Sequence, residues 1–161
     1  MRTILSVLKE GAEAPDFTLP DQNGDPVTLA DLRGRTVVLY FYPRADTPGC
    51  TIQACGVRDH AGDYEAAGAT VIGVSPDPQS AVARFAEKHS LRFPLLADED
   101  HAVAEAYGVW GEKHMYGKTY WGVSRSSFII DSEGRIAKVL PKISPKTHDG
   151  DILAALALAQ A

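Results

Sequence analysis

Long apolar runs alternate along this chain with segments that have helical periodicity. Residues 36–42 (TVVLYFY) form a continuous β-branched and aromatic run, which is typical of a strand covered on both faces of a sheet. Residues 69–77 (ATVIGVSPD) predict a second buried strand, and residues 78–90 predict an amphipathic helix after it. The periodicity of that helix turns three residues inward: Val82, Phe85 and Ala86.

Turn signals predict two β-hairpins. Asn23 and Gly24 form the strongest local hairpin signal, so residues 14–34 are expected to contain two short strands around them. Residues 126–140 (SSFIIDSEGRIAKVL) predict a second hairpin, with Ser132-Glu133-Gly134 as its turn. The first of these would be an N-terminal β-hairpin, and the second would lie late in the fold.

The remaining segments repeat the strand-then-helix order. Residues 93–98 and 101–109 predict a short strand and a short helix, and residues 147–161 a closing helix with Thr147 as its cap. Strands that alternate with helices, followed by a late hairpin, predict an α/β fold with a central mixed β-sheet flanked by helices. With no repeat or linker in the sequence, we expect residues 1–161 to form a single domain.

Composition narrows the classes of function. Hydrophobic residues make up 45% and charged residues 23%, and the net charge of −5 argues against nucleic acid or an anionic membrane as partner. No apolar run approaches the roughly 20 residues of a membrane span. The first 15 residues do not resemble a signal peptide, so we expect a cytoplasmic protein. Paired thiols in that compartment are usually redox-active or metal-binding.

Both cysteines lie in one stretch, residues 41–59 (FYPRADTPGCTIQACGVRD). Pro48 can open a helix after the buried strand, and this helix is expected to run through Cys50 to near Gly68. In its first turn Cys50 would face unpaired backbone N–H groups and the positive end of the helix dipole, which favour a thiolate. Cys50 is therefore a candidate nucleophile.

Nearby residues could assist such a nucleophile. Gly49 would let a small ligand approach the backbone closely. Thr47 supplies a hydroxyl three residues before the sulfur, which could cap the helix and also donate a hydrogen bond to the thiolate or to a bound oxygen. A cation would complete the site, and Arg125 and Arg44 are the candidates.

At this point the motifs resemble those of a known family. Residues 43–50 (PRADTPGC) match the Pro-x-x-x-Thr-x-x-Cys signature of peroxiredoxins, thiol peroxidases of thioredoxin-like fold. Residues 41–59, together with residues 109–131 (VWGEKHMYGKTYWGVSRSSFIID), resemble the Q-type subfamily, also called bacterioferritin comigratory proteins. The similarity extends over nearly the whole chain.

The resemblance implies a role for five residues. Cys50 stands at the peroxidatic position, Pro43 and Thr47 at the other two signature positions, and Arg125 at the active-site arginine. Cys55 stands where some Q-type members carry a resolving cysteine. Arg44 matches nothing in the family pattern and is interpreted as a solvated loop charge.

The resemblance also implies an activity. The protein would reduce hydrogen peroxide and organic hydroperoxides, with a sulfenic acid at Cys50 resolved by Cys55 as an intramolecular disulfide. A thioredoxin-type reductant would then reopen the disulfide, in an antioxidant role. No cofactor or metal is expected, because cysteine carries the redox change itself. An internal resolving thiol needs no partner subunit, so a monomer is expected.

The five-residue spacing constrains this chemistry. On one continuous helix the Cα atoms of Cys50 and Cys55 would lie about 8.5 Å apart, beyond the roughly 7 Å limit for a disulfide. We therefore expect the first helical turn to unwind after oxidation so that Cys55 can reach Cys50.

Other interpretations of the cysteines are weaker. A structural disulfide conflicts with the helix geometry and the expected compartment. A metal site at Cys50, Cys55 and His60 would need ligands on one helix face and a fourth donor. A thioredoxin-like reductase would need a Cys-x-x-Cys pair, which the sequence lacks, and a chaperone or interaction module is a further alternative.

Two other residue classes are interpreted structurally. Histidines outside the cysteine stretch are expected to be solvated: His89, His101, His114 and His148. The aromatic residues of the Gly-rich segment are expected to serve as packing or loop anchors: Tyr107, Trp110, Tyr116, Tyr120 and Trp121.

Overall fold

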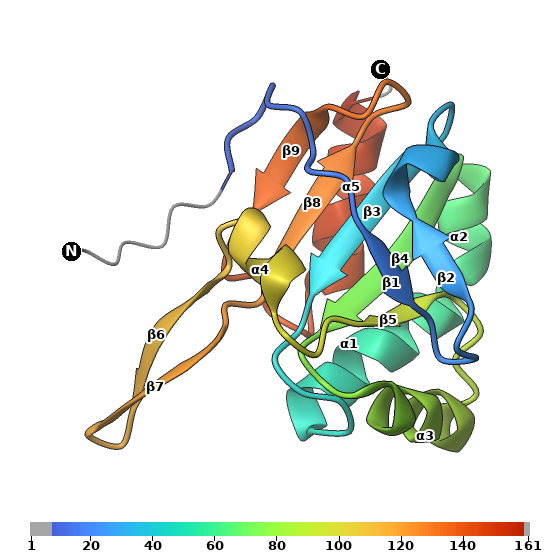
Figure 1. Cartoon of the computed structure of the whole chain (residues 1–161). Helices are drawn as coiled ribbons and strands as arrows, with labels where there is room; N and C mark the ends of the chain where they lie inside the picture. Colours follow the sequence, from blue (N-terminus) through green and yellow to red (C-terminus); the bar gives the residue numbers. More distant parts are fainter. Residues whose placement is uncertain (1–7, 160–161) are drawn as a thin grey trace.

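A five-stranded mixed sheet forms the centre of the computed structural model, which describes residues 8–159 (Figure 1). Its strands are ordered β5-β4-β3-β8-β9, with bounds Leu95–Ala97, Ala69–Ser75, Thr36–Phe41, Ser126–Ile130 and Ile136–Leu140. Strands β3, β4 and β5 are parallel, whereas β8 is antiparallel to β3 and to β9. Strand β3 therefore occupies the middle of the sheet.

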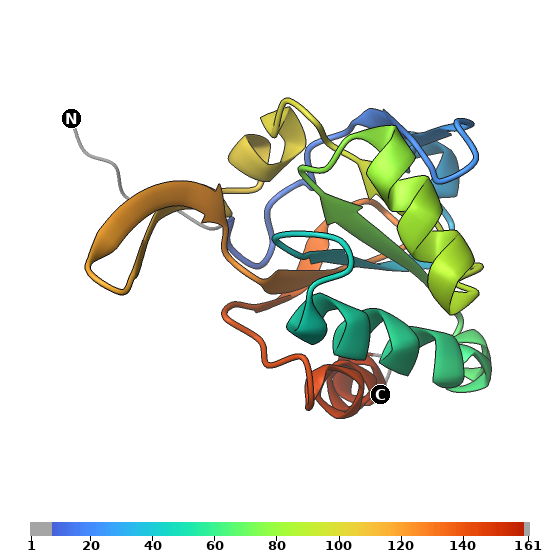
Figure 2. The same cartoon turned by 90° about the horizontal axis from the view of Figure 1, so that it is seen from below.

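Helices cover the sheet on both faces (Figure 2). Helices α1 (Pro48–Asp59), α2 (Ala61–Ala66) and α5 (His148–Ala159) pack on one face, and α3 (Gln79–His89) contributes to the same core beside β5. Helix α4 (Ala102–Ala106), the 3-10 turn Leu29–Leu32 and the N-terminal segment lie on the other face.

Strand β3 is buried on both faces, as its sequence predicts. Val38 and Tyr40 point into the core beneath α1 and α5, whereas Val37, Leu39 and Phe41 point into the core on the opposite face. Every side chain of β3 after Thr36 is at most 2% exposed. Burial of these side chains on both faces contributes hydrophobic stabilisation to both cores.

Several other predictions are confirmed. Strands β1 (Thr18–Pro20) and β2 (Pro26–Thr28) form the N-terminal hairpin around Gly24, whose φ of 84° suits glycine. The inward face of α3 consists of the three residues expected from its periodicity: Val82, Phe85 and Ala86. The late hairpin is formed by β8 and β9. Among residues 8–159, none of the helices has both the length and the apolar character needed to span a bilayer.

Two predictions are wrong, and a third holds only in part. The helix from Pro48 does not continue to Gly68 but breaks at His60, whose backbone leaves helical geometry (φ −102°, ψ 17°). Of the aromatic residues expected to be packing or loop anchors, Tyr107 is fully buried and Trp110 packs against the core. The others are exposed on an antiparallel hairpin, β6 (Trp110–Met115) with β7 (Lys118–Val123): Tyr116, Tyr120 and Trp121. His148 is not solvated but fully buried, with its Nε2 3.0 Å from the Ser127 hydroxyl.

The β6–β7 hairpin, called the arm below, projects beyond the central sheet (Figures 1 and 2). Its turn consists of Tyr116 and Gly117, both at positive φ (52° and 75°). Such a turn suits the twist of a hairpin, but a tyrosine is an uncommon first residue for it. The arm was therefore not recognisable from its turn sequence.

Asp149 holds the end of α1 against α5. Its carboxylate accepts a hydrogen bond from the Tyr64 hydroxyl (2.5 Å) and lies 3.6 Å from the His60 ring. The His60 ring also lies 2.9 Å from the Gly56 carbonyl oxygen. A Cβ at Gly56 would collide with the Asp149 carboxylate, so glycine is required for this approach. These contacts fix the last turn of α1 and the start of α2.

The charges in this cluster shift two pKa values. Burial disfavours the charged form of Asp149, but its contacts with His148, Tyr64 and His60 outweigh that effect and lower its pKa. The hydrogen bond to the Gly56 carbonyl and the charge of Asp149 raise the pKa of His60. The interaction is therefore strongest between the two pKa values, where the carboxylate and the imidazolium are both charged.

We expect His60→Gln to lower the free energy of unfolding most at about pH 5.5, between the ordinary histidine and aspartate pKa values. The raised pKa of His60 stabilises the fold below about pH 6.5, and this contribution is lost as pH rises through the folded-state pKa. The His60 side chain is 45% exposed, so the effect is small.

Urea unfolding at pH 5.5 and 8.5 measures this difference. The control is His114→Gln, which replaces an exposed histidine whose ring lies 3.1 Å from the Thr119 hydroxyl and far from Asp149 in the sequence. A His60→Gln effect that does not decrease toward pH 8.5 would contradict the assignment.

Candidate active site

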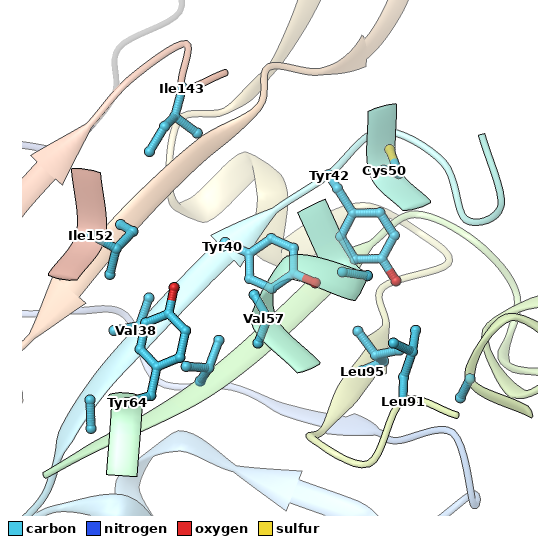
Figure 3. Close-up of a cluster of buried hydrophobic side chains, with 14 of the residues drawn as sticks. Val38, Tyr40, Tyr42, Cys50, Val57, Tyr64, Leu91, Leu95, Ile143 and Ile152 are labelled. Atoms are coloured by element: carbon cyan, nitrogen blue, oxygen red, sulfur yellow. The ribbon is translucent and has the colours of Figure 1, made fainter. Parts of the chain in front are cut away.

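Cys50 lies in the first turn of α1, directly after the loop that follows β3. The residue is 1% exposed and packs in the core face that contains Tyr40 and Tyr42 (Figure 3). Pro43 comes shortly after β3, and because proline has no backbone N–H, it cannot continue the hydrogen bonding between the strands. The sulfur therefore sits where the central strand ends and a helix begins, as the sequence predicts.

The loop between Pro43 and Cys50 is held by its neighbours. The Ala45 N–H donates to the Asp77 carboxylate (2.7 Å). Asp46 adopts a positive φ of 63°, and its carboxylate lies 2.9 Å from Lys88 Nζ and 3.2 Å from His89 Nε2. Hydrogen bonds from these two side chains lower the pKa of Asp46. The loop thus reaches α1 in a defined conformation.

Thr47 occupies the N-cap position of α1, but its hydroxyl does not cap the helix. It donates instead to the Arg44 carbonyl oxygen (2.8 Å). The expectation that this hydroxyl caps the helix is wrong, and its proton is already used within the loop. The Thr47 oxygen retains lone pairs that could accept a hydrogen bond from a ligand. The Arg44 side chain itself is exposed.

Arg125 lies between β7 and β8 and points its guanidinium at Cys50. Its Nη2 is 3.4 Å from Cys50 Sγ, which is hydrogen-bond distance for sulfur, and its Nη1 donates to Gln53 Oε1 (2.6 Å). A Cβ at Gly49 would stand 3.2 Å from Arg125 Nη2. Gly49 therefore makes room for the guanidinium, in addition to the ligand approach expected from the sequence.

Gln53 is a site residue that the sequence analysis missed. It is fully buried and lies one helical turn after Cys50, on the same face of α1. Its carbonyl oxygen fixes the orientation of the Arg125 guanidinium. A polar side chain at an inward helical position, three residues after a cysteine, was the available signal for it.

Two tyrosines adjoin the sulfur without acting as acids or bases. Burial raises the pKa of Tyr42 and of Tyr40 above the usual range, so both hydroxyls remain neutral at physiological pH. Since Gln53 is also neutral, the charged groups that can act directly on Cys50 come from the Arg125 side of the site.

Cys55 lies on the same helix as Cys50, and both thiols are free. Cys55 is partly exposed, whereas Cys50 is buried. The continuous helix separates their Cα atoms by about 8.5 Å and turns them to different faces. Cys50, Thr47 and Arg125 thus gather at one end of the helix, and Cys55 lies apart from them.

No metal site accompanies these residues in the described part of the chain. Within residues 8–159, no three metal-ligating side chains come together as a cation site.

Comparison with known proteins identifies the family. The model of the AhpC/TSA family matches residues 11–139. Peroxiredoxin Bcp of Escherichia coli is 50% identical over 149 residues, which are 92% of this chain and 96% of that protein. The chain belongs to the AhpC/TSA family, as a peroxiredoxin of the Q type. It is therefore a thiol-dependent peroxidase.

Other peroxiredoxins support this assignment. Peroxiredoxin Bcp of Bacillus subtilis is 46% identical over 146 residues, which are 91% of this chain and 93% of that protein. The crystal structure of a Xylella fastidiosa PrxQ mutant has a TM-score of 0.91 at 29% identity, covering 97% of this chain and 99% of the other. The predicted thioredoxin-like peroxiredoxin fold is thus confirmed.

We expect Gly49→Ala to slow the oxidation of the enzyme by peroxide by roughly five- to tenfold. The added methyl group crowds Arg125 Nη2, and losing a donor from a charged site has a large effect on rate. Arg125→Ala should show a larger loss, about 100-fold. Stopped-flow tryptophan fluorescence measures both rates.

The matched control is Gly62→Ala in α2, where an added Cβ would meet nothing within 4 Å. Its rate should equal that of the wild type. An unchanged rate in both Gly49→Ala and Arg125→Ala would remove Arg125 from the site.

Proposed function

We propose that Cys50 is the peroxidatic cysteine of this enzyme and that Cys55 resolves it. The observation that carries the proposal is the 3.4 Å contact between Arg125 Nη2 and Cys50 Sγ in the first turn of a helix. A guanidinium and the helix N-terminus both favour the thiolate, which is the form of cysteine that attacks. No carboxylate competes for Arg125 among the ion pairs of the described residues.

The first step is a displacement at oxygen. The Cys50 thiolate attacks one peroxide oxygen, the S–O bond forms and the O–O bond breaks. The electron pair of that bond goes to the departing oxygen, which takes a proton and leaves as water or an alcohol. Cys50 is oxidised to a sulfenic acid.

The site offers hydrogen-bond donors and an acceptor to the two oxygens of the peroxide. The Arg125 guanidinium and the first-turn N–H of Cys50 can donate to the charge that develops on oxygen. The Thr47 oxygen can accept the O–H of the incoming peroxide, because its own proton is donated to the Arg44 carbonyl. This role as acceptor replaces the donor role expected from the sequence. Pro43 ends β3 and so sets the course of the loop.

The second step forms a disulfide. The Cys55 sulfur attacks the Cys50 sulfur, the S–OH bond breaks, and water leaves. Because the two Cα atoms are too far apart on an intact helix, the first turns of α1 must unwind for this step. A thioredoxin-type dithiol then reduces the disulfide by thiol–disulfide exchange and becomes oxidised itself.

The cellular setting follows from the same chemistry. Disulfide recycling by a thioredoxin-type protein suits the cytoplasm, where thiols are kept reduced. A resolving thiol on the same chain lets a monomer complete the cycle. Hydrogen peroxide and small organic hydroperoxides are the proposed substrates, and antioxidant defence is the role.

We expect Cys50→Ser to abolish peroxide turnover with thioredoxin as reductant. Cys55→Ser should consume about one equivalent of peroxide and then stop, because its sulfenic acid has no internal thiol to attack it. Peroxide consumption and intact mass after one turnover measure these outcomes. Equal steady-state activity in the wild type and both variants would end the two-cysteine proposal.

We also expect oxidation to unwind only the start of α1. Amide hydrogen exchange in residues 48–56 should become faster by at least tenfold in the disulfide form, since helical hydrogen bonds are lost there. Peptides from α3 serve as the control within the same protein and should not change. Oxidised Cys55→Ser, which cannot form the disulfide, should retain the protection of the reduced enzyme. Identical protection in the reduced and disulfide forms would contradict the proposed unwinding.

A further inference from the structure

Lys113 on the arm is a cation whose side chain reaches back toward the active site. It lies in the middle of β6, and its Nζ donates to the Val123 carbonyl oxygen (2.8 Å) at the end of β7. Val123 is two residues before Arg125. The side chain passes over Gly122, where a Cβ would stand 3.2 Å from Lys113 Cδ. The ammonium group therefore ties β6 to the segment that carries the active-site arginine.

That segment is held by backbone hydrogen bonds as well. The Ser124 N–H donates to the Val109 carbonyl (2.8 Å), and the Ile143 N–H donates to the Arg125 carbonyl (3.0 Å). In the described part of the chain, Lys113 also makes the only side-chain hydrogen bond to the Val123 carbonyl. Together these bonds fix the direction in which Arg125 leaves the backbone.

The charges around Lys113 are unusual for a half-buried lysine. Among residues 8–159, no carboxylate lies within 4 Å of Lys113 or Arg125. Burial lowers the pKa of Lys113, and the positive charge of Arg125 lowers it further, whereas negative charge on Cys50 acts in the opposite direction. The Lys113 ammonium and the Arg125 guanidinium are thus two like charges that repel each other.

The other groups around the site do not balance these charges. On β3, Tyr40 and Tyr42 remain neutral, and on α1 Gln53 has no charge. On β7, Tyr120 presents its ring 6.0 Å from Lys113 Nζ. The Asp77 carboxylate accepts a hydrogen bond from the Ala45 N–H, and no ion pair joins it to either cation in the described part of the chain. A Cys50 thiolate is therefore an anion that both cations can share.

We propose that Lys113 is a positioning residue for the peroxidase reaction, because it fixes the strand end before Arg125 and places a second positive charge on the segment that carries this arginine. This proposal rests on the assignment of Cys50 as the attacking cysteine. Lys113 acts by holding the Arg125 guanidinium in position and by the electrostatic field of its own ammonium group, and the peroxide need not touch it.

The test is the pH dependence of the second-order rate of Cys50 with hydrogen peroxide in the full-length enzyme. In Lys113→Met, which keeps an unbranched side chain one atom shorter and removes its charge, the pH–rate curve should shift to higher pH by about one pH unit. The rate should fall roughly tenfold at the low-pH end and approach the wild-type rate at high pH. Lys113→Arg, which keeps the charge, should restore most of the rate.

A control on the same hairpin separates charge from general damage to the arm. Lys118→Met removes a lysine from the exposed end of β7 and should leave the curve unchanged. A loss in Lys113→Met that is equal at every pH, or a wild-type curve in that variant, would overturn the proposal. An equal shift in Lys118→Met would do so too.

The two assignments fail in different ways. If Cys50→Ser retains turnover, the assignment of the attacking cysteine is wrong. If Cys50→Ser is inactive but Lys113→Met has the wild-type curve, only the inference about Lys113 is wrong. Thermal unfolding of each variant, expected within a few degrees of the wild type, verifies that the fold is intact.

Discussion

The contact between a buried sulfur and a guanidinium governs the arrangement of this site. Cys50 is almost fully buried, and an ionised sulfur there needs compensation for the water that it loses. Arg125 provides a charge that stays protonated and a planar fork that can bind two acceptors at once. One branch contacts the sulfur and the other contacts Gln53, so the orientation of the guanidinium does not depend on the sulfur alone.

The fold brings these groups together from distant parts of the chain. Strand β3 ends at the centre of the sheet, and its loop delivers Cys50 to the start of α1. Arg125 arrives from the opposite direction along the chain, at the start of β8, which pairs with β3. Because β3 and β8 are neighbours and antiparallel, the end of one lies beside the beginning of the other. The antiparallel pairing of these two strands therefore positions the cation next to the thiol.

Sequence patterns predicted those features that depend on local order or on burial. The apolar run of β3 was readable because its side chains are buried on both faces of the sheet, and the periodic face of α3 was readable because its inward side chains all meet one core. The solvent-exposed arm was not, since glycines interrupt its alternation and Tyr116 hides the turn. The family motif named Cys50, Thr47 and Arg125, but Gln53 and Lys113 depend on contacts across the fold that no short motif contains.

The break at His60 has a consequence for the energetics of repeated turnover. In the proposed cycle α1 opens at one end, and such a helix needs a boundary beyond which order persists, because the loss of structure would otherwise spread into the core. The contacts that join His60 and Tyr64 to Asp149 provide such a boundary just past Cys55. The rearrangement can therefore be confined to about two helical turns, while the strands beneath keep their register. The opened segment can then re-form as a helix on the same surface of the sheet.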